Sequence, residues 1–112
     1  MPARNSKHLA FIRQLPCLVC QNNIETQAAH VKHRTDGGMS MRPGDNWVVP
    51  LCGNCHLNTD ESQHQTSELR FWSKFWGCSY EEAMDKTHAV ATALWNVSGD
   101  YDAGLAIVEG AK

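Results

Sequence analysis

The chain has 112 residues, of which 42% are hydrophobic and 20% charged, and its formal net charge is −2. This length suffices for one domain and not for two, and the apolar fraction is that of a globular rather than a disordered protein. No apolar run could span a bilayer, and the first fourteen residues lack the apolar core of a secretion signal. We therefore expect a cytoplasmic protein with no membrane partner.

The charges are unevenly distributed along the chain. Residues 1–42 contain six Lys or Arg against two acidic residues, whereas residues 43–112 contain four against ten. A basic face in the first part could meet a phosphate backbone although the whole chain is mildly acidic. Ordinary solvated surface charge explains the same pattern equally well, so charge alone does not identify a nucleic-acid binder.

The first half of the chain predicts one short helix and two short strands. Ser6 is a suitable N-cap for a helix over 6–14, and Pro16 follows its end. Residues 26–31 and 47–51 have the character of short strands, and Pro50 indicates that the second lies at a sheet edge. Between them, residues 32–46 are rich in Gly, Asp and Pro and predict a loop.

The second half predicts two clearer helices. Residues 66–76 carry large apolar side chains at helical spacing, and Gly77 is a fitting C-terminal stop. Ser79 and Glu82 form a capping box, which predicts a helix over 80–97 that Gly99 ends. Residues 99–112 show little pattern and are expected to form a mobile tail.

Four of the five cysteines form two pairs in the spacing C-x2-C-x31-C-x2-C, namely Cys17, Cys20, Cys52 and Cys55. Each C-x-x-C brings two thiolates to one turn, and two such turns complete the tetrahedral shell that Zn²⁺ prefers. In a reducing compartment clustered thiols hold metal more often than they form disulfides. The pattern therefore predicts one structural zinc, around which a domain of this size can be stabilised. The fifth cysteine, Cys78, is interpreted as a small buried hydrophobe.

Among the six histidines, His30, His56 and His64 stand out by their order relative to the strands and the cysteine pairs. The stretch AAHVKHRTDGGMSMRPGDNWVVPLCGNCH resembles the core of the HNH, or ββα-metal (His-Me finger), endonucleases. Small phage-encoded members, including the recombination-enhancement (RecA-dependent) nucleases, are the more similar group. The resemblance covers about residues 11–77.

The resemblance implies a role for each of these residues. His30 matches the general base that activates water, a task suited to an imidazole whose pKa lies near neutral pH. His56, on a helix expected to begin at the second cysteine pair, matches the ligand of a catalytic Mg²⁺ or Mn²⁺, and His64 a second ligand. Asn46 matches the asparagine that holds the base. Lys32, Arg34 and Arg42 would contact the phosphates of DNA, and His33 is another such contact or merely exposed.

The sequence departs from the family pattern in two places. Most members have Asp or His before the base as another metal ligand, whereas this chain has Ala29, so the third ligand would be Asp36, Asp60 or Glu61. Asn46 lies six positions before Cys52, one more than is usual. Asp45 could take the role of the asparagine instead, or Trp47 could mark a small bulge.

For the fold we expect a single α+β domain over 1–112, with a zinc-stabilised ββα-metal (treble-clef-like) core and flanking helices. For function the expectation is a metal-dependent DNA endonuclease or nickase acting in phage or prophage DNA recombination or processing, with a recombination protein as a further partner. The alternatives are a catalytically inactive zinc-stabilised DNA- or protein-binding module, and a zinc-ribbon-like structural domain. His30 discriminates, because only the enzyme needs an imidazole there.

Overall fold

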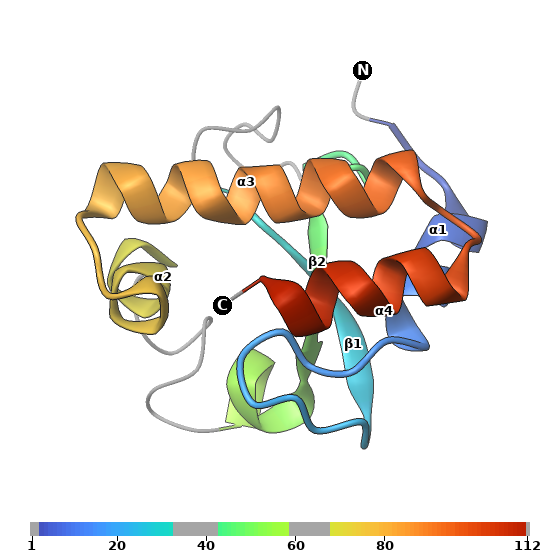
Figure 1. The fold of residues 1–112 in the computed structure, drawn as a ribbon, viewed down its shortest axis with the longest axis horizontal. Helices are drawn as coiled ribbons and strands as arrows, with labels where there is room; N and C mark the ends of the chain where they lie inside the picture. Colours follow the sequence, from blue (N-terminus) through green and yellow to red (C-terminus); the bar gives the residue numbers. More distant parts are fainter. Residues whose placement is uncertain (1–2, 33–42, 59–67, 112) are drawn as a thin grey trace.

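The computed structural model describes residues 3–32, 43–58 and 68–111, which form a mixed α+β structure around a two-stranded sheet (Figure 1). The elements in chain order are α1 (Ser6–Arg13), β1 (Thr26–His30), β2 (Val48–Cys52), the π-helical turn η1 (Asn54–Asn58), α2 (Glu68–Trp76), α3 (Tyr80–Asn96) and α4 (Tyr101–Gly110). This agrees with the expected α+β class.

The sheet is an antiparallel hairpin in which Thr26 pairs with Cys52 and His30 pairs with Val48. Every residue of β2 is buried, whereas in β1 Thr26 and Ala29 are buried and the other three residues are partly exposed. Pro50 is accommodated in β2 because the strand has only one neighbour in the sheet, and its carbonyl accepts a hydrogen bond from the Leu18 amide at 2.8 Å. The hairpin therefore places His30 and Cys52 near its opposite ends.

Helix α1 begins at Ser6 and its N-cap is Asn5, so the prediction of Ser6 as the N-cap is wrong. Asn5 has an extended backbone, and its side chain accepts a hydrogen bond from the amide of His8. Asparagine caps at least as well as serine, and here the hydrogen bond from the Asn5 amide to Asp45 favours Asn5. The buried face of α1 consists of His8, Phe11 and Ile12, and it packs on both strands.

Helices α2 and α3 agree with their predicted ranges. Gly77 adopts a φ of +70° after α2, the left-handed conformation that glycine tolerates without strain. Ser79 caps α3 by accepting a hydrogen bond from the amide of Glu82. Figure 1 shows α3 running across the hairpin, with α2 at one of its ends. Within the described residues, no helix is both long enough and apolar enough to cross a membrane.

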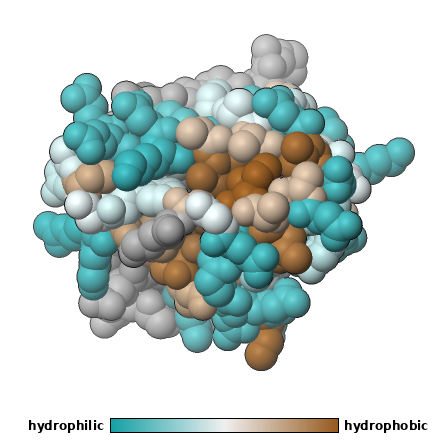
Figure 2. Space-filling view, in the orientation of Figure 1, coloured by the Kyte–Doolittle hydropathy of each residue, from teal (hydrophilic) through white to brown (hydrophobic). Residues whose placement is uncertain are grey.

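The C-terminal segment differs from the expected tail, because residues 101–110 form α4. Asp100 caps this helix through a hydrogen bond from the amide of Ala103. Gly104 and Gly110 lower the intrinsic helix propensity and obscured the pattern, but Gly104 lies directly against the side chains of Phe11 and Leu15. Figure 2 shows apolar side chains gathered over α4 and its seam with α3. Tertiary packing thus stabilises a helix that local propensity does not predict.

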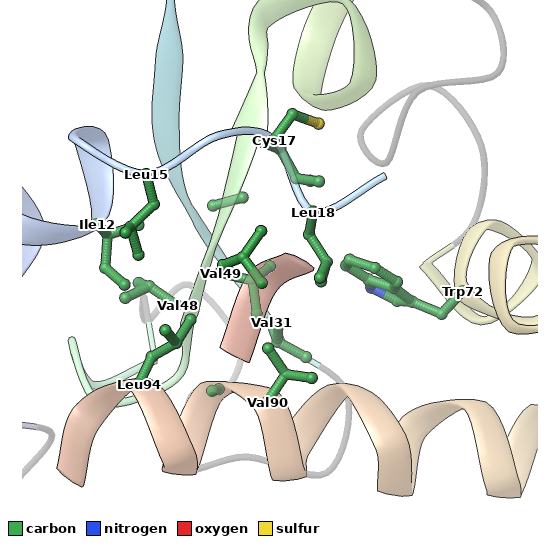
Figure 3. Close-up of a cluster of buried hydrophobic side chains, with 14 of the residues drawn as sticks. Ile12, Leu15, Cys17, Leu18, Val31, Val48, Val49, Trp72, Val90 and Leu94 are labelled. Atoms are coloured by element: carbon green, nitrogen blue, oxygen red, sulfur yellow. The ribbon is translucent and has the colours of Figure 1, made fainter. Parts of the chain in front are cut away.

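The core lies between the hairpin and the helices (Figure 3). Val48 and Val49 of β2 face Val90 and Leu94 of α3, and Trp72 of α2 points toward Leu18. All six side chains except Val90 are essentially inaccessible to solvent. This packing connects the first cysteine pair, the hairpin and helices α2 and α3 into one body.

Candidate functional site

The first candidate site is the cluster formed by Cys17, Cys20, Cys52 and Cys55. The four Sγ atoms all lie within 4.8 Å of one another, and those of Cys20 and Cys52 are 3.5 Å apart. Cys17 and Cys52 are buried, while Cys20 is exposed, so one side of the cluster faces solvent. Within the described residues, this is the only group of three or more potential metal ligands in such proximity.

The local fold explains how Cys20 and Cys52, which are 32 positions apart in the sequence, meet here. The amide of Leu18 donates to the carbonyl of Pro50, which ties the first pair to the strand that ends at Cys52. The amide of Gln21 bonds to the carbonyl of Cys17 at 2.9 Å, and Gln21 itself has a φ of +62° that closes the first turn. The two strands lie between the cysteine pairs in the sequence, and because they are antiparallel they bring the second pair back beside the first.

The protonation of these thiols depends on their mutual proximity. Burial raises the pKa of Cys20 and also that of Cys55, and the charge of Cys17 raises the pKa of Cys55 further. Burial also acts to raise the pKa of Cys52, but hydrogen bonds from the Cys55 backbone and from the neighbouring thiols outweigh it, and the net shift is downward. Four thiolates at this separation repel one another strongly, and a divalent cation would compensate that charge. The tetrad is thus compatible with a structural zinc ion.

The second candidate site is centred on His30, at the end of β1. Its Nε2 atom lies 3.0 Å from Oδ1 of Asp45, and the two side chains are 13% and 3% exposed. With Nε2 protonated, the carboxylate accepts this hydrogen bond and holds the imidazole in one orientation. In that tautomer Nδ1 carries the lone pair. An imidazole that a carboxylate orients in this way can act as a general base.

Asn46, the residue that matches the family asparagine, does not make the corresponding contact. Its Oδ1 atom is buried and accepts no hydrogen bond from the described residues. The next residue, Trp47, continues the hairpin, because its carbonyl accepts from the amide of Val31 at 2.8 Å. Asp45 and Asn46 lie in the turn before β2, which a hydrogen bond from the Trp47 amide to the Gly44 carbonyl closes at 3.0 Å. The structure brings Asp45, the alternative residue, to the histidine.

His56 belongs to η1 and lies beside β1. Its Nδ1 atom is 2.6 Å from Oε1 of Gln27. An amide oxygen can only accept, so Nδ1 is the protonated nitrogen and Nε2 is the atom with the lone pair. An imidazole held in this way resembles metal-binding histidines, whose second nitrogen commonly donates to an oxygen of the protein.

His30 and His56 lie at different positions along β1, His30 as a residue of the strand and His56 through its contact with Gln27. Gln27, the partner of His56, is three residues from His30, which corresponds to roughly 10 Å along an extended strand. Side chains three positions apart leave a strand on opposite faces. The structure therefore brings together His30 with Asp45 and His56 with Gln27, as two separate pairs.

The remaining predicted residues fall into two groups. Lys32 is exposed two residues after His30, and its backbone amide bonds to a carboxylate oxygen of Glu68 at 3.0 Å. Ala29 is completely buried in the core. The others lie outside the described residues: His33, Arg34, Asp36, Arg42, Asp60, Glu61 and His64.

Sequence patterns did not indicate three residues that contact these pairs. Gln27 lies on a short strand with no motif around it, and Arg4 and Asn5 precede the part of the chain that resembles a family. Arg4 and Asn5 contact Asp45 across some 40 positions of sequence. The only local signal was the capping tendency of Asn5, which explains its place before α1 but not its contact with Asp45.

Comparison with known proteins gives one family. No curated protein and no solved structure matches the chain. Residues 2–89 match a family described as a protein of unknown function (DUF968). The match includes both cysteine pairs, the hairpin, His30, Asp45 and His56, and it ends within α3. Because it spans well over half of the sequence, the chain belongs to the DUF968 family.

Proposed function

We propose that this protein is a metal-dependent DNA endonuclease or nickase of the HNH (ββα-metal) type, which hydrolyses phosphodiester bonds. The observation that carries the proposal is the 3.0 Å contact between His30 Nε2 and Asp45 Oδ1 at the end of a hairpin anchored by four cysteines. A binding module needs no imidazole held by a buried carboxylate. A hydrolase needs a base with a fixed orientation and a pKa near neutrality.

The chemistry assigned to His30 is proton transfer from water. Nδ1 accepts a proton as the water oxygen attacks phosphorus, and the bond from phosphorus to the leaving sugar oxygen breaks. The leaving oxygen takes a proton from solvent. Asp45 stays ionised and stabilises the imidazolium formed in this step. Its near-complete burial keeps water from competing for the hydrogen bond.

His56 is the described residue suited to hold the catalytic Mg²⁺ or Mn²⁺, since Gln27 leaves its Nε2 atom as the ligand. We assign His64 as the second ligand and Asp36, Asp60 or Glu61 as the third, because buried Ala29 has no donor atom. When bound, the cation would polarise the phosphate and stabilise the leaving oxygen.

Lys32 would then contact a phosphate next to the scissile one, together with Arg34 and Arg42. On the resemblance alone we extend the proposal to phage or prophage DNA recombination or processing, with a recombination protein as partner. A catalytically inactive zinc-stabilised binding module is the second candidate. It is favoured by Ala29, which occupies the position of a metal ligand in most HNH enzymes.

The test is cleavage of supercoiled plasmid and of single-stranded DNA with Mg²⁺ or Mn²⁺, comparing wild type with His30→Ala. His88→Ala is the matched control, since His88 lies on α3 and contacts Trp47. Zinc content and circular dichroism show that all three proteins are folded. We expect wild type and His88→Ala to cut and His30→Ala to be inactive. Equal cutting by His30→Ala, or no cutting by wild type on plasmid, single-stranded and branched DNA, contradicts the proposal. DNA binding without cleavage would support the second candidate.

A further inference from the structure

The N-terminal segment Ala3–Asn5 contacts the short segment 43–45 through both backbone and side-chain atoms. The amide of Asp45 donates to the carbonyl of Ala3 at 2.7 Å, and the amide of Asn5 donates to Asp45 Oδ2 at 2.7 Å. A guanidinium nitrogen of Arg4 donates to the carbonyl of Pro43 at 2.7 Å and lies 3.7 Å from Asp45 Oδ1. Asp45 is therefore held at its backbone and at both carboxylate oxygens.

The carboxylate of Asp45 is shared among three partners. Oδ2 accepts from the Asn5 amide, so the carboxylate cannot rotate freely, and Oδ1 is left to face both His30 and Arg4. Asn5 is itself fixed as the N-cap of α1 by its bond to the His8 amide. The N-terminus of α1 therefore fixes the Asp45 carboxylate, and this carboxylate in turn fixes the orientation of the His30 imidazole.

We propose that Arg4 is a positioning residue for His30: it holds Asp45 and its charge keeps the imidazole neutral near physiological pH. The role as part of a catalytic base rests on the proposed function, whereas the electrostatic coupling does not. The guanidinium offsets the negative charge of Asp45 and thereby reduces the stabilisation of a positive imidazolium. Arg4 thus acts on His30 through Asp45, and without it Asp45 would favour the protonated histidine.

Among residues 3–32, 43–58 and 68–111, the other charged or titratable groups near the pair do not replace Arg4. On α1, His8 interacts electrostatically with Asp45 but is buried, and burial lowers its pKa, which favours the neutral form. Lys32, two residues after His30, is exposed, and its backbone amide donates to a carboxylate oxygen of Glu68 in α2. On α3, His88 packs edge-on against Trp47. Among the described residues, Arg4 is the guanidinium next to the Asp45 carboxylate.

The first test is an NMR titration of the His30 ring in isotope-labelled, zinc-loaded full-length protein, with no catalytic metal added. His30→Gln identifies the signal. In Arg4→Gln we expect the pKa of His30 to rise by about half a unit, a modest shift because Arg4 is partly exposed. Arg4→Lys keeps the charge and should restore most of the wild-type value. Arg13→Gln, at the exposed end of α1, is the matched control and should leave the titration unchanged.

The second test is the pH profile of DNA cleavage by the same variants. For Arg4→Gln, the acid side of the profile should move to higher pH by the same shift, with the rate recovering at alkaline pH. A residue needed only for folding would lower the rate at every pH without moving the profile. An unchanged His30 pKa in folded Arg4→Gln overturns the inference. A shifted pKa in a protein that cuts no DNA supports the coupling and refutes the nuclease proposal, so the two failures are distinguishable.

Discussion

The imidazole of His30 is hydrogen-bonded to Asp45, 15 positions later in the sequence, with Nε2 and Oδ1 3.0 Å apart. The neighbouring Asn46 has the residue type expected from HNH enzymes, yet its side-chain oxygen is buried without a partner among the described residues. A carboxylate in this place does more than orient the ring, because it would also stabilise the positive charge of His30 if the imidazole acts as the proposed base.

This relationship predicts a large loss of cleavage rate for a substitution of Asp45 and a small loss for one of the neighbouring Asn46. Asp45→Asn removes the negative charge with little change of shape and should lower the cleavage rate about 100-fold or more. Asn46→Ala should lower it less than about 10-fold, because the Oδ1 atom of Asn46 accepts no hydrogen bond from the described residues. Single-turnover cleavage with saturating metal measures both, after zinc content has been matched. A larger loss for Asn46→Ala would assign the supporting role to the asparagine.

The cysteine tetrad predicts about one zinc ion per chain and a large dependence of folding on it. Cys52→Ser should abolish stoichiometric zinc and lower the melting temperature by more than about 10 °C, since metal binding contributes folding free energy directly. Cys78→Ser is the matched control, because Cys78 lies between α2 and α3 outside the tetrad. Elemental analysis and thermal unfolding test this. Full zinc occupancy in Cys52→Ser would contradict the assignment.

The packing of α4 on α1 predicts an unfavourable effect of one added methyl group. A Cβ atom at Gly104 would lie 2.7 Å from Phe11 Cζ and 3.2 Å from a Leu15 methyl carbon, and both side chains are buried. Gly104→Ala should therefore destabilise the protein by about 1–3 kcal/mol. Gly110→Ala, in the same helix but with nothing within 4 Å, should be neutral or slightly stabilising. Urea unfolding distinguishes them, and equal effects would argue against this packing.

The buried histidine of α1 predicts a pH dependence of stability. His8 is inaccessible to solvent, its Nδ1 atom lies 2.7 Å from Ser98 Oγ, and burial lowers its pKa below the ordinary 6.5 despite the nearby Asp45. Below pH 6.5 the unfolded chain binds a proton that the folded chain does not, so this contribution to stability is present above 6.5 and is lost as pH falls. In urea unfolding at several pH values, His8→Gln should lose less stability than wild type between neutral and mildly acid pH. Parallel curves would show that His8 titrates alike in both states.

Local features account for the parts of the structure that agree with the sequence-based predictions. The two C-x-x-C turns, the two short strands and the Ser79 cap of α3 each depend on residues within a few positions of one another. The N-cap of α1 shows the limit of such patterns. Asn5 and Ser6 are both good caps, and Asn5 is selected because its amide also bonds to Asp45.

The C-terminal helix α4 also shows the limit of local sequence patterns, because they failed to predict it. Gly104 and Gly110 weaken the helical pattern, so residues 99–112 read as a tail, yet the small Gly104 lets α4 approach Phe11 and Leu15 closely. The stabilisation comes from buried surface shared with α1, about 90 positions earlier. Propensity summed over a short window cannot include that contribution.

The sequence by itself determined the four cysteines of the candidate zinc site, the strand that carries His30 and the helices that cover the hairpin. These follow from ligand spacing, residue type and periodicity, which act over short distances along the chain. Only the tertiary structure decided that Asp45 rather than Asn46 meets His30, that Gln27 holds His56, and that Arg4 and Asn5 hold Asp45. Those choices depend on which side chains face one another after the chain has folded, between positions that have no local relation in the sequence.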